Sequence, residues 1–563
     1  MVEQYLNGCG ELVEKGQYQE ALSGYAMVSK LSPSSFEART GAAICHSYLN
    51  NWREAFENIL LVLQTGGYRA KELKVLIEML ERSNLNSYIE PIERALIAAL
   101  KHTKLEHPAI VLLSKQLRFK HEMLFSKTPN SFDGNVEAFL IDHTLCLILE
   151  RQLNNSYLIE DVIYLSRKAL LERAIAGENI NRFIPFLSSL SCQMLLTDGL
   201  FFASKEEKAL LETLVSTNSE NIESLLIQIC YMNTEDALCF WTNNQNAFKS
   251  DTLAQLNSDL EFYSTVMMSQ NRGSIDNNLS KAVQSFYIEN PYPKWKTTQV
   301  NEECSIAPIF QKRGKKTPNE LTILSAGCGT GIQLVDLATS QPNATIIAID
   351  LSPASIAYAQ QMTQKYGINN IEFHLLDILK VAELGYTFDM IVCTGVLHHM
   401  QSPQDGLDAL ASVLSTDGAM HLAYYSTLAR VELKQITQDI TEFLAVDEQS
   451  ITREGIRHWR SQLTKEQKQR AWYRNLDFFN LSGLFDLLFH PQQAEYSPLE
   501  LEAMLTAAGM KFDWMNRKQN FHSVERKHPA PASGETMHYW DEIEKQTPDL
   551  FMGMISFYAS KAV

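Results

Sequence analysis

The chain has 563 residues, of which 45% are hydrophobic, and a formal net charge of −17. This length allows three or four domains with ample apolar core, and the negative charge argues against broad nucleic-acid binding. No apolar run approaches the ~18 residues of a membrane span, and the N-terminus lacks the basic and apolar segments of a secretory signal. We therefore expect a cytoplasmic protein that binds neither nucleic acid nor membrane.

The first part of the chain repeats itself every 34 residues: Gly16-Gln-Tyr-Gln-Glu-Ala21 aligns with Asn50-Asn-Trp-Arg-Glu-Ala55. A small alanine after an aromatic residue allows two helices to approach closely, and the pattern resembles a pair of tetratricopeptide repeats. We predict such helical repeats over residues 1–103 and a helical middle domain over 104–270, where apolar residues recur at three-and-four spacing. A Ser-, Asn- and Gly-rich segment, 269–280, is the predicted linker into a third domain, 271–563.

A short apolar run in this third domain breaks into three glycines at alternate positions. Residues 323–331 read Ile-Leu-Ser-Ala-Gly-Cys-Gly-Thr-Gly and precede an amphipathic segment. This order predicts a strand, a tight turn and the start of a helix. The glycines remove the Cβ atoms that would keep a ligand from the backbone, and the helix N-terminus offers N–H groups to an anion. We therefore expect a nucleotide-like ligand.

Further strands alternate with helices at regular spacing. The run 345–349 ends in Asp350, which can accept both hydroxyls of a ribose. The run 371–376 ends at Asp377, the run 388–393 leads into a Thr-Gly-Val-Leu-His-His segment, and a fifth strand follows at 419–425. This alternation predicts a parallel doubly wound sheet with ligand loops at the carboxyl ends of its strands.

The motifs in this order resemble the class I S-adenosylmethionine-dependent methyltransferases. The loop lacks the Gly-x-Gly-x-x-Gly of NAD dehydrogenases. The resemblance implies a Rossmann-like domain with S-adenosyl-L-methionine as cofactor. The glycine loop would hold the methionine part, Asp350 the ribose and Asp377 the adenine. The implied cofactor-binding residues are Gly327, Cys328, Gly329, Gly331, Asp350, Leu351, Asp377 and Ile378.

A proline-rich aromatic segment lies ahead of the first strand. Residues 287–295 read Tyr-Ile-Glu-Asn-Pro-Tyr-Pro-Lys-Trp, which cannot continue a helix. We expect Tyr287, Tyr292 and Trp295 to cover the cofactor. The Asn-Pro-Tyr-Pro order resembles bacterial methyltransferases with N-terminal tetratricopeptide repeats, and that resemblance extends over essentially the whole chain. A looser similarity links it to bacterial protein-lysine methyltransferases.

Candidates for the acceptor side follow the fourth and fifth strands and lie in a helical insertion predicted at about 427–496. His398 and His399 follow the fourth strand, with a structural role as the alternative. Tyr424 and Tyr425 end the fifth strand, and only one can face the pocket; Tyr425 is the chosen one. Asp486 and His490 lie four apart, so a surface ion pair is their alternative reading. The predicted catalytic residues are Tyr425, His398 and His399; the predicted substrate-binding residues are Tyr424, Arg430, Asp486 and His490; no metal site is predicted.

These features together predict a methyltransferase that acts on a protein or peptide. Helical repeats usually present a concave face to another polypeptide, which favours such a substrate, and a lysine amine is the favoured acceptor. One alternative is a small-molecule methyltransferase whose helical half serves for dimerisation, so a homodimer is possible. A second alternative is an interaction protein that binds the cofactor without turnover.

Overall fold

The computed structural model describes residues 2–66, 68–126, 131–217, 221–269, 287, 291–300, 306–446, 451–517, 524, 528 and 534–562. The chain divides into two compact units, residues 1–190 with 297–299 and residues 191–296 with 300–563. This division falls inside the middle helical region that the sequence predicts as 104–270. Nearly all of the predicted linker, 269–280, lies outside the described residues. Among the described helices, none is long and apolar enough to cross a membrane.

The first unit is helical, and its first four helices keep the spacing seen in the sequence. Helices α1 (Val2–Glu14) and α3 (Phe36–Tyr48) begin 34 residues apart, as do α2 (Tyr18–Leu31) and α4 (Trp52–Gly66). Gly41 faces the ring of Tyr25, where a Cβ would lie only 2.2 Å away. The assignment to tetratricopeptide repeats stays a prediction. The later helices are α5 (Ala70–Arg82), α6 (Glu90–Ala99), α7 (Thr103–Lys120), α8 (Glu122–Phe125), α9 (Gly134–Leu140), α10 (His143–Arg151) and α11 (Tyr157–Ile175). Helix α12 (Ile184–Thr197) begins in this unit and ends in the second.

The second unit joins a group of helices to a sheet. Helix α16 packs on α20, where the rings of Phe262 and Tyr358 meet edge to face with centroids 4.7 Å apart. This contact fixes the helical group against the ligand-binding half of the sheet. The helices of the group are α13 (Lys205–Thr217), α14 (Ile222–Ile229), α15 (Thr234–Asn244) and α16 (Ala254–Met268), and α20 spans Pro353–Lys365.

A seven-stranded sheet in the order β3-β2-β1-β4-β5-β7-β6 forms the core of this unit. Strands β1 to β5 are parallel, as the sequence predicts, but β7 runs antiparallel to both β5 and β6. The sheet is therefore mixed. Strands β6 and β7, which follow the insertion, were not predicted from the sequence. The strands are β1 (Thr322–Ala326), β2 (Thr345–Asp350), β3 (Ile371–Leu375), β4 (Phe388–Thr394), β5 (Leu414–Tyr424), β6 (Met510–Met515) and β7 (Ile555–Lys561).

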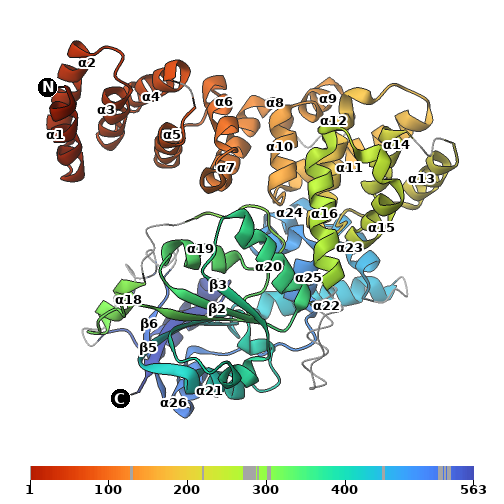
Figure 1. Cartoon of the computed structure of the whole chain (residues 1–563). Coiled ribbons are helices and arrows are strands. Elements are labelled where there is room, and N and C mark those ends of the chain that lie inside the picture. Colours follow the sequence, from red (N-terminus) through yellow and green to blue (C-terminus); the bar gives the residue numbers. More distant parts are fainter. Residues whose placement is uncertain are drawn as a thin grey trace. The chain divides into compact units, whose positions relative to one another are not determined.

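Helices cover both faces of the sheet (Figure 1). Ile323 and Ile346 point to the face that carries α19 (Ile332–Ser340) and α20. Their neighbours Leu324 and Ile347 point to the opposite face, which α21 (Pro403–Val413) and α26 (Pro498–Ala507) cover. Burial on both faces explains the almost continuous apolar runs of these strands, and it leaves the carboxyl ends of the strands as the place for polar ligand groups.

Helices also occupy the segment between β5 and β6. Ser426 pairs with Tyr496 in an isolated parallel bridge, so the chain leaves the sheet and returns to the same point. The elements between these residues are α22 (Val431–Val446), α23 (Arg453–Ser461), α24 (Lys465–Gln469), η7 (Trp472–Arg474), η8 (Leu476–Phe479) and α25 (Leu481–Phe489). We call residues 427–495 the insertion.

A buried carboxyl group contacts Ser426, where the insertion leaves the sheet. Glu544, on α28 (Met537–Gln546), is 1% exposed and accepts a hydrogen bond from the Ser426 hydroxyl. Burial raises the pKa of Glu544 to about 7, and the nearby Asp541 adds to the rise. The folded protein therefore binds a proton at Glu544 more tightly than the unfolded chain does. Stability from this group is present at acidic pH and is lost as the pH rises toward 7.

We expect Glu544→Gln to raise the melting temperature at pH 8 and to leave it almost unchanged near pH 5. A pKa that rises from 4.5 to about 7 on folding corresponds to roughly 3 kcal/mol. Gln keeps a partner for Ser426 without a buried charge. Thermal unfolding at both pH values, with Glu542→Gln on the same helix as exposed control, measures the effect. An equal change in melting temperature at pH 5 and pH 8 would contradict this account.

Candidate active site

The glycine loop bends sharply over the end of β1. Gly327, Gly329 and Gly331 all have positive φ angles, 70°, 51° and 84°. A Cβ on Gly327 would lie 2.5 Å from the Val396 side chain, and one on Gly331 would lie 2.8 Å from Ala359. Both the backbone conformation and the close packing therefore require glycine. The same bend leaves the backbone of Gly327 and Gly329 open toward a cavity.

Two acidic residues end the neighbouring strands, as expected. Asp350, at the end of β2, accepts hydrogen bonds from the N–H groups of Gly329 (2.7 Å) and Ser352 (2.8 Å). Burial raises the pKa of Asp350, and these N–H groups oppose the rise. Asp377, beyond β3, accepts from the N–H of Leu379 at 3.0 Å and so caps η5 (Ile378–Leu384). The carboxylate of Asp350 and the glycine loop are thus one connected unit.

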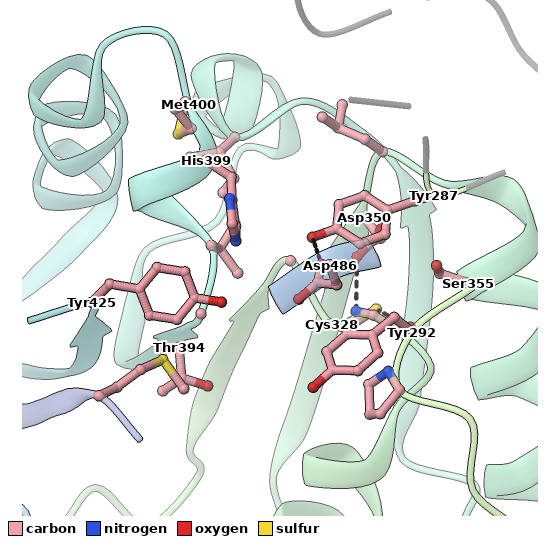
Figure 2. A pocket seen from close by; sticks show the side chains of 18 of the residues that line it. Tyr287, Tyr292, Cys328, Asp350, Ser355, Thr394, His399, Met400, Tyr425 and Asp486 are labelled. Atoms are coloured by element: carbon pink, nitrogen blue, oxygen red, sulfur yellow. Dashed lines mark hydrogen bonds between the residues drawn. The ribbon is translucent and has the colours of Figure 1, made fainter. Parts of the chain in front are cut away.

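A cavity of about 700 Å³ opens at this edge of the sheet (Figure 2), within the size range of small-molecule and cofactor sites. Its lining includes most of the predicted cofactor residues: Tyr287, Tyr292, Gly327, Cys328, Gly329, Asp350, Leu351, Asp377 and Ile378.

Two predicted cofactor residues do not line the cavity. Gly331 has turned away to become the N-cap of α19. Trp295 is 6% exposed, and its indole N–H donates to the carbonyl oxygen of Thr330 at 3.2 Å. Trp295 therefore supports the glycine loop from behind, and the expectation that it covers the cofactor directly was wrong, because its ring packs between the loop and α20.

Two tyrosines and two carboxyl groups form a wall of the cavity. The Tyr287 hydroxyl donates to Asp486 at 2.8 Å, and the Tyr292 hydroxyl donates to Asp477 at 2.5 Å. Burial raises the pKa of Asp477 to about 6 and that of Asp486 to about 7; the hydrogen bonds from tyrosine oppose the rise. We call Asp477, Asp486, Tyr287 and Tyr292 the carboxyl wall. It joins the segment before β1 to the insertion.

His399 and Tyr425 lie opposite Asp486 in the same cavity (Figure 2). The Nδ1 of His399 lies 2.8 Å from the carbonyl oxygen of Gln492. Burial, together with the neighbouring His398 and His490, lowers the pKa of His399, so the imidazole is neutral. The guanidinium of Arg430 stacks on the ring of Tyr425, 3.9 Å from its centroid. Tyr425 is thereby fixed with its face against a cation and its hydroxyl toward the cavity.

Three further predicted residues lie behind this surface and do not line the cavity. His398 is fully buried, with its ring 3.9 Å from that of Tyr425. Tyr424 packs into the sheet core against Phe557 and Tyr496, because successive strand residues face opposite sides. Arg430 donates to the carbonyl oxygen of Leu487 at 2.6 Å. The predictions that His398 is catalytic and that Tyr424 and Arg430 bind substrate are therefore corrected, because these three side chains support the cavity wall from behind.

The remaining predicted pair, Asp486 and His490, is buried, so the alternative of a surface ion pair does not hold. Asp486 belongs to α25 and His490 is the C-cap of that helix. The ring of His490 lies against that of His399, with centroids 3.8 Å apart. His399, Asp486 and His490 each offer one ligand atom, and these atoms all lie within 4.8 Å of one another. Spacing along the sequence did not indicate this cluster, because His399 and His490 are brought together only by the return of the insertion.

Several cavity residues were not predicted as site residues. Asp477 lies between apolar residues in Leu476-Asp-Phe-Phe479, and an acidic residue in such an apolar setting is the signal that would have found it. The segment 552–554 precedes β7, whose position beside β5 the sequence did not reveal. The unpredicted lining includes Trp472, Asn475, Asp477, Thr394, Met400, Met552, Gly553 and Met554.

Comparisons with known proteins agree with this geometry. Residues 318–480 match a family model described as "Methyltransferase domain". An uncharacterized protein of Synechococcus sp. is 35% identical over 199 residues, which cover 34% of this chain and 47% of that protein. Malonyl-[acyl-carrier protein] O-methyltransferase of Acetivibrio thermocellus is 29% identical over 131 residues, which cover 23% of this chain and 45% of that enzyme. The chain thus spans about half the length of these curated relatives.

Among solved structures, PKMT2 from Rickettsia typhi in complex with AdoHcy aligns with a TM-score of 0.36 and 17% identity. The alignment covers 48% of this chain and 55% of that one. A TM-score this low carries no conclusion about a shared fold or function. The family-model match, the glycine loop and the acidic strand ends agree with one another. The chain therefore contains a class I methyltransferase domain whose cofactor is S-adenosylmethionine.

Proposed function

We propose that the chain transfers a methyl group from S-adenosylmethionine to an amine of a polypeptide, with a lysine side chain as the favoured acceptor. The observation that carries this proposal is the carboxyl wall, which shares one cavity with the glycine loop and Asp350. A positively charged amine that enters this cavity meets two buried carboxyl groups and aromatic rings, and both attract cations.

The cofactor side of the cavity fits the expected ligand. The backbone of Gly327 and Gly329 is exposed to it, and a Cβ at Gly329 would lie 3.3 Å from the carbonyl oxygen of Tyr292. A side chain there would fill the space that a ligand needs. Asp350 and Asp377 provide carboxylates for hydroxyl and amino groups. When bound, S-adenosylmethionine supplies a methyl group made electrophilic by its sulfonium.

The acceptor side must position an amine and accept its proton. Methyl transfer depends chiefly on alignment, with the nucleophile about 3 to 3.5 Å from the methyl carbon. An exposed lysine is charged near neutral pH, so it must lose a proton first. Asp486 is the carboxyl group that we assign to hold the amine and receive this proton. Tyr287 fixes the orientation of Asp486, while Tyr425 and His399 bound the space in front of it.

The helical first unit favours a polypeptide substrate. Paired helices in series commonly form extended binding surfaces for other chains. A second candidate function is methylation of an oxygen on a small or carrier-bound acid, which the named activity of the Acetivibrio thermocellus relative suggests. The carboxyl wall favours the first candidate, because a negatively charged acid would be repelled by two nearby carboxyl groups.

We expect Asp350→Ala to weaken binding of S-adenosylmethionine at least 10-fold. The substitution removes both the ribose partner and the acceptor that holds the N–H of Gly329. Calorimetric titration with the cofactor measures the affinity. Glu383→Ala, an exposed acidic residue on η5, is the control. Equal affinity in the Asp350 variant and the control would remove Asp350 from the cofactor site.

We expect transfer of methyl label from S-adenosylmethionine to one or a few protein bands of a soluble bacterial lysate, and none with Asp350→Ala. The lysate is separated into macromolecular and small-molecule fractions, and the labelled residue is identified by mass spectrometry. Label found only among small molecules would replace the polypeptide proposal by the second candidate. Methyl label on carboxyl oxygen would refute the amine assignment.

We expect Asp486→Asn to slow label transfer at least about 100-fold, the size of a lost proton acceptor, without a change in cofactor affinity. Asn fills the same space and can still bond to Tyr287, but it cannot take a proton from an ammonium group. Glu442→Gln, exposed on α22, is the matched control in the insertion. An unchanged rate in the Asp486 variant, measured on the same protein band, would show that another group accepts the proton.

A further inference from the structure

We propose that His399, Asp486 and His490 form a binding site for one divalent transition-metal ion of the zinc class. His399 comes from η6 (Leu397–His399), directly after β4, whereas Asp486 and His490 come from the end of the insertion. The metal would therefore join the methyltransferase core to the insertion. The proposed methyl transfer uses Asp486 and His399 but does not require these two residues and His490 to act as one set.

The donor set fits such an ion. Two imidazoles and one carboxylate are typical ligands of zinc and of related transition metals. One ligand atom from each residue lies within 4.8 Å of the others, and all three residues are buried. Ligands bound at about 2.0 to 2.2 Å around a tetrahedral ion are about 3.3 Å apart, so small side-chain rotations toward one another complete the site.

A second contact shell holds the ligands in a suitable orientation. The carbonyl oxygen of Gln492 lies 2.8 Å from Nδ1 of His399 and 2.6 Å from Nδ1 of His490. The Gln492 N–H is also near Nδ1 of His490, at 3.1 Å, but the carbonyl contact is shorter. We therefore assign the protons to Nδ1 and the lone pairs to Nε2 of both rings. Metal-binding histidines commonly donate their other N–H to a carbonyl oxygen in this way.

The carboxylate is oriented as well. Tyr287 donates to Oδ1 of Asp486 at 2.8 Å. Both Asp486 and His399 line the cavity, so a fourth coordination position would face it. Three protein ligands with an open fourth position is the arrangement of zinc sites that keep access to small ligands.

A metal ion bound to these three residues would change the charge and the free ligand groups that an acceptor amine encounters in the cavity. The metal would take the carboxylate of Asp486, which the proposed function assigns to the amine. Like charges also repel, so an ion of charge +2 opposes a protonated amine beside it. We therefore infer that metal and amine exclude each other. This step rests on the proposed function, whereas metal binding itself does not.

Calorimetric titration of the full chain, previously treated with a chelator and dialysed, tests the site. ZnCl2 should bind once per chain with micromolar or tighter affinity, and MgCl2 should not bind. CoCl2 should give the visible absorption of tetrahedral cobalt. His399→Ala and His490→Ala should each weaken zinc binding at least 100-fold, while His538→Ala, on an exposed histidine, should not. Circular dichroism establishes that each variant is folded. If His490→Ala is not folded, His490→Gln is used in its place.

Absence of stoichiometric zinc binding, or equal binding by the folded His399 and His490 variants, would overturn the proposal. The label-transfer assay tests exclusion. One equivalent of ZnCl2 should lower the rate at least 10-fold, and a chelator should restore it. An unchanged rate with zinc bound would overturn the exclusion alone. Zinc binding without label transfer in either condition would keep the site and count against the proposed function.

Discussion

The buried ion pair between Lys294 and Asp198 connects the two segments that form the carboxyl wall. The ammonium lies 2.7 Å from the carboxylate, and both side chains are almost fully buried. Burial alone would raise the pKa of Asp198, but Lys294 and Arg453 lower it below its usual value. Asp198 also accepts from Ser482, at the start of α25, while Lys294 follows directly on Tyr292 and Pro293. A buried pair adds little stability over apolar packing, yet breaking it leaves an uncompensated charge. Its value here is geometric, because one contact positions both the segment before β1 and the insertion.

That geometry explains why the carboxyl wall can exist. Tyr292 and Asp477 reach each other from elements that are both attached near Asp198, and Asn480 donates to the carbonyl oxygen of Leu196. Carboxyl groups held in a buried wall interact more strongly with an incoming charge than they would in water. They also need little reorganisation when the ligand arrives, since each is already oriented by a tyrosine. The chemistry of the acceptor side thus follows from the same contacts that fix the fold of the second unit.

Sequence patterns predicted most of the cavity lining that comes from the sheet edge and less of the lining that comes from the insertion. Gly327, Gly329 and Asp350 lie within one strand-turn-helix and the next strand, so local periodicity places them. Asp477 and Asp486 reach the cavity only because the insertion returns to Tyr496, and no local sequence pattern indicates that return. The alternation of strand residues correctly separated Tyr425 from Tyr424. Strand alternation could not distinguish His398 from His399, because both lie in one turn of 3-10 helix. In the structure His399 faces the cavity and His398 faces the protein interior.

This separation assigns different tasks to different parts of the second unit. Residues on the sheet edge, Asp350 and Asp377, meet a ligand that is the same in every turnover. Residues of the insertion, Asp477 and Asp486, line the part of the cavity that we propose for the acceptor. Asp350 accepts hydrogen bonds from the backbone of the glycine loop and of Ser352, whereas Asp477 and Asp486 accept from Tyr292 and Tyr287. We therefore expect a change in the insertion to alter the acceptor side without disturbing the glycine loop. Tyr287 and Tyr292 are the exception. They line the cavity together with the glycine loop and donate hydrogen bonds to the insertion, so these two side chains connect the two parts of the cavity.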